Sequence, residues 1–389
     1  MFSTLCIISV FVMSLLIAPP SVFAVGRDYW ICALAGSECT MGVEIAGSHH
    51  WDHSNGTLRS RRILHEGCHL HMARVPQTVL DAAGSYTLHL RRIVERKPYF
   101  TECGETESPT FSFRPCAVKS SFKIINLADA HNLVDAPIAA GRHFGDALDL
   151  LVLNGDIPNH SGDLRYFETI YQIAGRVTDG ACPCIFARGN HDMRGNCAEL
   201  LADHVPTNNG LPYFTFRAGP IWGVVLDAAE DKPDDFPEYG HTICAHDFRL
   251  EEDAWLDRML VSHDWRGAAL RLIISHKPLA HEIRAPFDIE KDLYRNWCAK
   301  LKKIRPHLHL SGHLHECFVE RPGGGHDDYG LPCLHVCSSL VRTEEPVEFT
   351  CGAVTIDMDG VRPFVHVDFV DNKGTVKHVF DGEAGSRRV

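Results

Sequence analysis

The stretch Ala187–Gly195, ARGNHDMRG, directly follows the apolar residues Ile185 and Phe186. It places Asn, His and Asp side by side at the end of a run that is typical of a buried strand. Three consecutive polar side chains are costly to bury unless each finds a partner. They are therefore either residues of a surface turn or the rim of a binding site.

Four more apolar runs end in residues of the same kind. The runs and the residues that follow them are 122–128 with Asp129 and His131, 148–154 with Gly155 and Asp156, 270–275 with His276, and 307–311 with Gly312, His313 and His315. Helical segments alternate with these runs and strands follow, which predicts a layered α/β domain with mixed sheets. Because ligands of open α/β sheets bind beyond the carboxyl ends of the strands, we expect these side chains to gather at one edge.

The intervening segments carry helical periodicity. The spacing of apolar residues predicts a helix over 164–174, with Ser161 at the position of an N-cap. Two later helices are expected at 251–260 and 289–301.

The polar residues at the strand ends are typical of a metal site. Carboxylate, imidazole and carboxamide together favour borderline divalent metals, whereas calcium prefers an all-oxygen shell. The candidate ligands are Asp129, His131, Asp156, Asn190, His276, His313 and His315. Seven are more than one ion needs, but about what two ions with a shared carboxylate need. The DAH, GD and lone His motifs are weak alone and GNHD and GHLH are moderately specific, whereas the ordered set is not explained by chance turns. Zinc, manganese and iron all suit such ligands.

This ordered set, DAH, GD, GNHD, H and GHLH, resembles the calcineurin-like metallophosphoesterase superfamily over about residues 121–370. The β-rich N-terminal part followed by this domain is similar to the layout of purple acid phosphatases. The stretches 226–240 and 188–195 are more similar to the bacterial-type branch. The resemblance implies an αββα domain of two mixed sheets flanked by helices.

The sequence departs from true purple acid phosphatases at two positions. Their first motif is Asp-x-Gly, whereas His131 stands at the third position here, and Asn159 stands where they carry a tyrosine ligand. Without that tyrosinate, the charge-transfer colour should be absent and an obligatory ferric ion is not implied.

The resemblance also implies roles for individual residues. One metal would be held by Asp129, His131, Asp156 and His315, and the second by Asp156, Asn190, His276 and His313. A hydroxide shared by the ions would attack phosphorus, while His191 protonates the leaving oxygen and Asp192 helps to orient His191. A packing role for His191 is the alternative. Arg194 either binds the substrate phosphate or is a solvated loop arginine.

The first 24 residues have the features of a secretory signal. Leu5 to Ala18 is almost wholly apolar, and Val22 and Ala24 are small residues before a cut. We therefore expect a secreted protein without a membrane span after signal removal; an uncleaved anchor is the alternative, because no Lys or Arg precedes the apolar run. Short β-type runs over 25–118 predict a small β-sandwich domain of Ig or fibronectin type. The phosphoesterase domain would then occupy 119–389.

Cysteine usage agrees with export. Of 15 cysteines, 14 follow the signal, which suggests several disulfides, with buried thiols as the alternative. The sequons at Asn55 and Asn159 predict a glycoprotein, although a glycan at Asn159 would lie beside the metals and is not expected. The acidic run 230–240 is expected to be a solvated loop.

The net charge of −12 argues against general affinity for nucleic acid or anionic membranes. It permits an anionic substrate, because bound metals reverse the local field. We therefore expect a secreted dinuclear-metal hydrolase of phosphate mono- or diesters. The alternative is a secreted binding protein on an inactive scaffold, with the β-rich part as the working module. Oligomeric state stays open.

Overall fold

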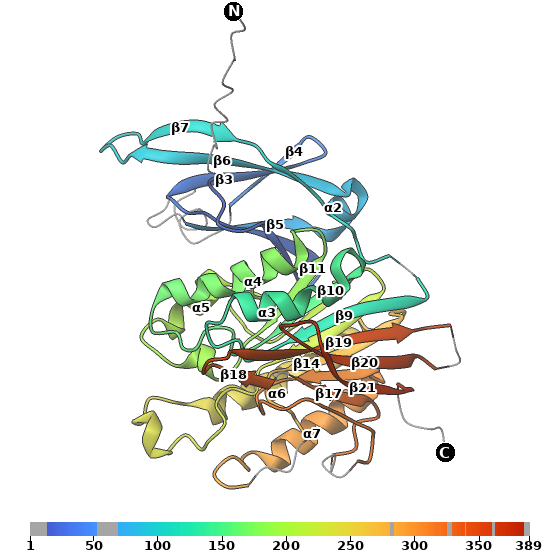
Figure 1. Cartoon of the computed structure of the whole chain (residues 1–389). Helices are drawn as coiled ribbons and strands as arrows, with labels where there is room; N and C mark the ends of the chain where they lie inside the picture. Colours follow the sequence, from blue (N-terminus) through green and yellow to red (C-terminus); the bar gives the residue numbers. More distant parts are fainter. Residues whose placement is uncertain are drawn as a thin grey trace, which may run out of the picture.

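The computed structural model describes residues 14–52, 69–117, 119–280, 284–324, 329–338, 340–359 and 362–384. Within these residues, two large sheets pack face to face and helices cover their outer faces (Figure 1). A smaller third sheet, also from the N-terminal part of the chain, lies beside one edge of the larger of the two. The mixed α/β architecture with mixed sheets confirms the coarse fold prediction.

The larger sheet has ten strands. In spatial order they are β21 (Val376–Glu383), β20 (Phe364–Asp371), β19 (Glu348–Asp357), β9 (Ser121–Leu127), β10 (Leu150–Asn154), β11 (Pro183–Ala187), β1 (Ser21–Val25), β2 (Asp28–Leu34) and β5 (Leu70–Pro76), with β18 (Leu340–Arg342) paired to β19. The strands β9, β10, β11 and β1 are parallel to their neighbours in that series. Three of them match predicted strands closely.

The second large sheet has six strands. In spatial order they are β12 (Phe214–Ala218), β13 (Ile221–Leu226), β14 (Leu270–Ser275), β15 (Leu308–Ser311), β17 (Leu334–Cys337) and β16 (Phe318–Glu320). The four central strands run parallel, and the edge strands run antiparallel. The predicted strands at 270–275 and 307–311 are present as β14 and β15.

The third sheet is formed by the N-terminal part of the chain. Its strands are β4 (Ser48–Trp51), β3 (Cys39–Ile45), β6 (Ser85–Glu95) and β7 (Glu102–Glu107), with β8 (Thr110–Ser112) paired to β6.

The helices connect the strands. They are α2 (Gln77–Ala83), α3 (Asp135–Gly141), α4 (Glu168–Thr178), α5 (Leu201–His204), α6 (Ala245–Ser262) and α7 (Lys291–Leu301), with 3-10 turns η1 (Arg142–Ala147), η2 (Leu164–Phe167), η3 (His191–Met193), η4 (Ala198–Leu200), η5 (Pro237–Tyr239) and η6 (Lys302–Ile304). Both later predicted helices are present, as α6 and α7.

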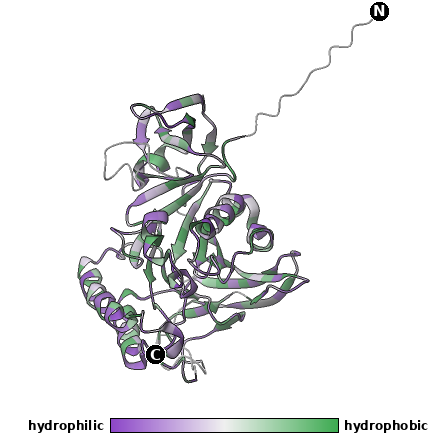
Figure 2. Cartoon of the chain, turned by 90° about the vertical axis from the view of Figure 1, so that its left-hand side faces the viewer, coloured by the Kyte–Doolittle hydropathy of each residue, from purple (hydrophilic) through white to green (hydrophobic). Residues whose placement is uncertain are grey.

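Alternation along the strands produces the layers. Ile124 of β9 and Leu272 of β14 both belong to the core cluster between the two large sheets. Their chain neighbours point outward: Ile125 packs in a cluster with α4, and Ile273 packs in a cluster with α6 and α7. Figure 2 shows these outer helices striped with apolar and polar residues. Successive strand residues point to opposite faces, so an almost continuous apolar run is what a sheet covered on both sides requires.

The first predicted helix begins differently from the expectation. Asp163, not Ser161, caps η2, and its side chain accepts a hydrogen bond from the Arg165 backbone. The Ser161 hydroxyl donates instead to the backbone carbonyl of Asp192, at 2.6 Å. A short polar side chain can cap a helix or bind a distant loop, and the Ser161 side chain binds the distant loop.

The predicted separate sandwich over 25–118 is not confirmed. The strands β1, β2 and β5 belong to the ten-stranded sheet, and β1 pairs in parallel with β11 of the α/β core. The boundary expected after Ala24 falls inside β1. The region also contains a short helix, α2, where none was expected.

Among the residues that the structure describes, the cysteines form no disulfide. Most of them are buried, and several of these, such as Cys32, Cys184 and Cys351, lie in strands. The predicted disulfides are therefore absent from the part of the chain that the structure describes. Asn55, one of the two predicted glycosylation sites, lies outside the described residues. Among the described helices, none has the length and hydropathy that crossing a membrane would need.

The position of β1 yields a prediction about the N-terminus. Val22, Phe23 and Ala24 are at most 1% exposed between β11 and β2. Burying one large apolar side chain contributes about 1.5–3 kcal/mol. A chain that starts at Val25 should therefore melt well below one that starts at Ser14, as measured by circular dichroism. Equal melting temperatures would contradict an essential β1, and N-terminal sequencing of exported protein would show where any cut falls.

Candidate metal centre

The seven candidate ligands lie together at the carboxyl ends of strands from both large sheets. Asp129, Asp156 and Asn190 follow β9, β10 and β11 of the first sheet, and His276 and His313 follow β14 and β15 of the second. His131 and His315 extend the first and last of these turns. The two sheets pack face to face, so their strand ends bring the residues into one cluster.

The first group consists of Asp129, His131 and His315, whose ligand atoms lie within 4.8 Å of one another. The Nε2 atoms of His131 and His315 are 3.2 Å apart, and His315 Nε2 is 3.5 Å from Asp129 Oδ1. Donor atoms that share one ion at 2.0–2.2 Å lie roughly 3 Å apart. The spacing of this group therefore fits a common cation.

The second group consists of Asp156, His276 and His313, with Asn190 beside it. His276 Nε2 is 3.1 Å from Asp156 Oδ2, and His313 Nδ1 is 3.0 Å from Asn190 Oδ1. The other ring nitrogen of His276 donates to the Asn154 carbonyl at 2.6 Å. This bond fixes the tautomer of His276 and leaves its Nε2 free to bind a metal.

Buried atoms without partners test whether the residues fit cations. Among the described residues, Asp129 Oδ1, His131 Nδ1 and His276 Nε2 are buried and make no hydrogen bond. Such atoms cost free energy unless something binds them. Two of the three, Asp129 Oδ1 and His276 Nε2, belong to the contacts described above. The residues present therefore fit a pair of metal ions.

The charges of the cluster lead to the same conclusion. Burial by itself lowers the pKa of His276, but Asp156 and Asp129 outweigh it and raise that pKa to about 10. Burial lowers the pKa of His313 to about 3, helped by the neighbouring His276. Asp129 and Asp156 are 0% and 2% exposed. Without a metal, a proton on His276 is the nearest positive charge, and a divalent cation can replace it.

The backbone at the site is strained. Five of the seven candidate ligands have positive φ: Asp129, His131, Asp156, His313 and His315, at 45° to 71°. Non-glycine residues in this region cost on the order of 1–3 kcal/mol each. The strain turns the chain sharply after each strand, so that the side chain aims back across the strand ends.

Two glycines make room for these turns. A Cβ on Gly155, where φ is +82°, would lie 2.6 Å from the His276 ring. A Cβ on Gly189 would lie 2.2 Å from Asp156 Oδ1. The glycines of the GD and GNHD motifs are thus required by close approach to two candidate ligands.

His191 lies at the edge of the cluster. Its ring centre is 4.7 Å from that of His131, and its Nδ1 is 2.7 Å from the Asn159 carbonyl. Its Nε2 is 3.3 Å from an N–H nitrogen of Arg194. A carbonyl can only accept and a guanidinium can only donate, so the proton of the neutral ring sits on Nδ1. The backbone N–H of His191 donates to Asp156 Oδ1 at 2.8 Å.

Arg194 is fixed by acids rather than solvated. Its Nε and one terminal nitrogen bind both carboxylate oxygens of Glu230, at 2.8 and 2.7 Å. Asp231 lies 3.4 Å away. The remaining terminal nitrogen faces His191. This bidentate geometry is the strong form of a charge-assisted hydrogen bond, so the guanidinium is held with one edge toward the cluster.

Asp192 does not contact the His191 ring, so its expected orienting role has no support in the observed contacts. Its Oδ2 accepts from the backbone N–H groups of Gly189, at 2.7 Å, and of Asp156, at 3.1 Å. Burial, reinforced by the nearby Asp156, raises the pKa of Asp192 to about 8. Asp192 therefore ties together the turns that carry Asn190 and Asp156.

The acidic run was expected to be a solvated loop, and its first residues are not. Glu230, Asp231 and Lys232 are 0%, 6% and 9% exposed. Tyr239 donates to Glu230 Oε2 at 3.0 Å, and Asp231 Oδ2 lies 3.7 Å from His313 Nε2. Sequence reasoning missed these residues because their partner, Arg194, lies 36 residues earlier in the chain. In the sequence, only the arginine that follows GNHD and the distant acidic run could have indicated this ion pair.

The comparison with protein families identifies the chain. A model of the calcineurin-like phosphoesterase domain matches residues 122–317, which contain all seven candidate ligands. The chain belongs to the calcineurin-like phosphoesterase family. No curated protein matches the sequence.

Several solved structures are similar to this phosphoesterase to different degrees. A purple acid phosphatase from seeds of yellow lupin (Lupinus luteus) is 12% identical, with a TM-score of 0.59 over 93% of this chain and 73% of that one. PhoD is 10% identical, with a TM-score of 0.49 over 96% and 93% of the two chains. A dimetal phosphatase from Danio rerio is 13% identical, with a TM-score of 0.45 over 70% and 99%. The fold shared with the lupin enzyme agrees with the predicted resemblance.

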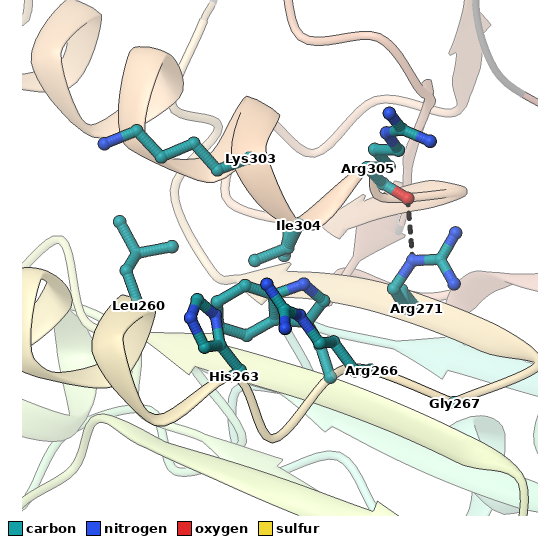
Figure 3. Close-up of a pocket in the computed structure, with 9 residues that line it drawn as sticks. Leu260, His263, Arg266, Gly267, Arg271, Lys303, Ile304 and Arg305 are labelled. Carbon is teal, nitrogen blue, oxygen red and sulfur yellow. Dashed lines mark hydrogen bonds between the residues drawn. The ribbon is translucent and has the colours of Figure 1, made fainter.

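A cavity of about 530 Å³ lies elsewhere on this phosphoesterase. Figure 3 shows His263, Arg266, Arg271, Lys303 and Arg305 around it, with Arg271 donating to the Arg305 carbonyl at 2.9 Å. Arg271 is near the amino end of β14, whereas His276 follows its carboxyl end. The cavity is thus at the opposite end of the strands from the metal-ligand cluster.

Asp156 lies near both groups of candidate ligands, because its carboxylate is within 4.8 Å of a ring nitrogen of His131 as well as of His276 and His313. This yields a prediction. Asp156→Asn should lower the zinc or manganese content of the purified chain by one ion or more, because it removes the shared negative charge. Elemental analysis measures the content. Asp146→Asn is the matched control, since its carboxylate is fully exposed and lies 3.8 Å from Arg114. Unchanged metal content in Asp156→Asn would exclude Asp156 as the shared ligand.

Proposed function

We propose that this chain is an exported dinuclear-metal phosphoesterase that hydrolyses phosphate mono- or diesters. The observation that carries the proposal is the joining of Asp129, His131 and His315 with Asp156, His276, His313 and Asn190 at one sheet edge. The family supports the reaction class. Export rests on the apolar first residues alone.

The protein's contribution begins with positioning. Asp129, His131, Asp156 and His315 would hold one ion, and Asp156, Asn190, His276 and His313 the other. Two bound ions would neutralise phosphoryl charge and lower the pKa of water toward neutrality. The His276 bond to the Asn154 carbonyl and the His191 backbone bond to Asp156 keep these ligands in place.

His191 is the residue we assign to proton transfer. Its imidazole is beside both groups of ligands but is tied to neither by a hydrogen bond of its ring. When doubly protonated, it keeps Nδ1–H on the Asn159 carbonyl and can give the Nε2 proton to a leaving oxygen. The Arg194 nitrogen that contacts Nε2 in this structure would then bind a phosphoryl oxygen instead.

The rival function is binding without catalysis on the same scaffold. A catalyst and a binding protein differ in turnover. The chain that starts at Ser14 is loaded with manganese or zinc and given p-nitrophenyl phosphate and its bis-ester. We expect hydrolysis of at least one ester that depends on added metal and is lost in Asp156→Asn. Metal uptake without hydrolysis of either ester or of a wider phosphoester panel would favour the binding protein.

His191→Ala should slow esters with poor leaving groups most. General acid catalysis contributes roughly 10²–10⁴-fold, and p-nitrophenolate needs little protonation. We expect alkyl phosphate hydrolysis to fall by about that factor while metal content is unchanged. His160→Ala is the matched control, because this exposed imidazole packs edge-to-face against Tyr166. An equal effect on alkyl and p-nitrophenyl esters would exclude the acid role.

Glu230→Gln should loosen Arg194. A hydrogen bond to a charged group contributes about 1.5–3 kcal/mol, so a mispositioned guanidinium should raise KM by roughly 10- to 100-fold. Because Glu230 touches none of the candidate ligands, metal content should stay the same. Steady-state kinetics and elemental analysis measure both quantities. A KM equal to that of the unaltered chain would exclude a substrate-binding role for Arg194.

A further inference from the structure

The outer face of the N-terminal sheet carries a second cluster of metal-type side chains. Glu44 of β3, His49 of β4 and His89 of β6 offer ligand atoms that lie within 4.8 Å of one another. Their strands are those drawn at the top of Figure 1, away from the strand ends that hold the other cluster. None of the three has a part in the proposed phosphoester chemistry.

The sheet register explains why these residues meet. Glu44 is directly opposite His49, and His89 is opposite Gly42, two residues before Glu44. All three point to the same face, because the alternate residues Val43 and Leu88 are buried on the other side. His49 and His89 thus flank Glu44 from the two strands on either side of β3, and the space above Gly42 is filled by the Trp51 ring.

The distances suit one ion. His89 Nε2 is 3.0 Å and His49 Nε2 is 3.9 Å from the same oxygen, Oε2 of Glu44. Two ligands at 2.0–2.1 Å from a tetrahedral ion are roughly 3.3 Å apart, which lies between these values. The rings of His49 and His89 are 5.8 Å apart. Calcium prefers a shell made only of oxygen atoms, so two imidazoles and one carboxylate do not suit it. This ligand set favours a borderline transition metal.

Neighbouring side chains hold the two histidines. His89 Nδ1 is 2.9 Å from the Ser108 hydroxyl, which orients the ring and leaves Nε2 toward Glu44. Metal-ligating histidines commonly have such a partner on the second nitrogen. His49 stacks on Trp51, with the planes 17° apart. Three strands of one sheet thus fix the ligands before any ion arrives.

We propose that Glu44, His49 and His89 form a mononuclear site for zinc or a similar divalent transition metal. The side chains are 38%, 53% and 29% exposed, so water completes the coordination from the open side. The site is independent of the proposed phosphoesterase reaction. Bound metal would link β3, β4 and β6 and stabilise this sheet, because it binds the folded form only.

The test is zinc stoichiometry of the metal-stripped full chain, measured by calorimetric titration. His89→Ala should bind one zinc fewer than the unaltered chain, and so should His49→Ala. His246→Ala should not, because His246 pairs with Glu290 at 2.7 Å without a second imidazole. Ser108→Ala should keep the stoichiometry but bind that zinc about 10- to 100-fold more weakly.

The same titration on Asp156→Asn separates this site from the other centre. The His89-dependent zinc should persist in that background and disappear when His89→Ala is added. If His89→Ala and His49→Ala both fold and bind as much zinc as the unaltered chain, the cluster is only a set of His–Glu pairs and the proposal is overturned. If Asp156→Asn binds as much zinc as the unaltered chain while His89→Ala binds one zinc fewer, the phosphoesterase proposal is contradicted and this one stands.

Discussion

The burial of two carboxylates constrains the rest of the structure. Asp129 and Asp156 are almost inaccessible at the ends of adjacent parallel strands, and each lies near the imidazole of His276. An ionised carboxylate in such surroundings is strongly destabilising unless it is paired or binds a metal. His276, His315 and backbone N–H groups supply part of the compensation. The remaining unpartnered atoms point to what a pair of cations would add.

The turns after the strands store strain for the same purpose. Left-handed conformations at Asp129, Asp156 and His313 are unfavourable one by one, yet all occur within one cluster. Each turn is fixed by hydrogen bonds from another turn: Asp129 Oδ2 accepts from the His313 backbone, and Asp192 accepts from the Asp156 backbone. The ligands thus hold one another in place, and strain at one turn is offset by contacts from the next.

The sequence predicted the parts of the fold that rest on local pattern. Apolar runs ending in ligand-type residues identified β9, β14 and the cluster. This worked because the carboxyl ends of parallel strands lie at the same edge of a sheet, so residues that follow such strands come close together. It failed where partners are distant or where one composition serves two purposes. Residues 21–24 are apolar as the end of the predicted leader and equally as β1, and their pairing with β11 is not evident from the local sequence. In the sequence, Glu230 is one of several acids in an acidic run, and its ion pair with Arg194 is seen only in the structure.

The division of ligands between the sheets has a consequence for stability. The first sheet supplies both carboxylates, Asn190 and His131, while the second supplies His276, His313 and His315. Neither sheet alone offers a complete ligand set, so each group of ligands spans the face between them. A cation bound there would therefore stabilise the packing of one sheet on the other, and its binding free energy would add to that of folding. The chemistry of the site and the packing of the two large sheets therefore depend on the same contacts.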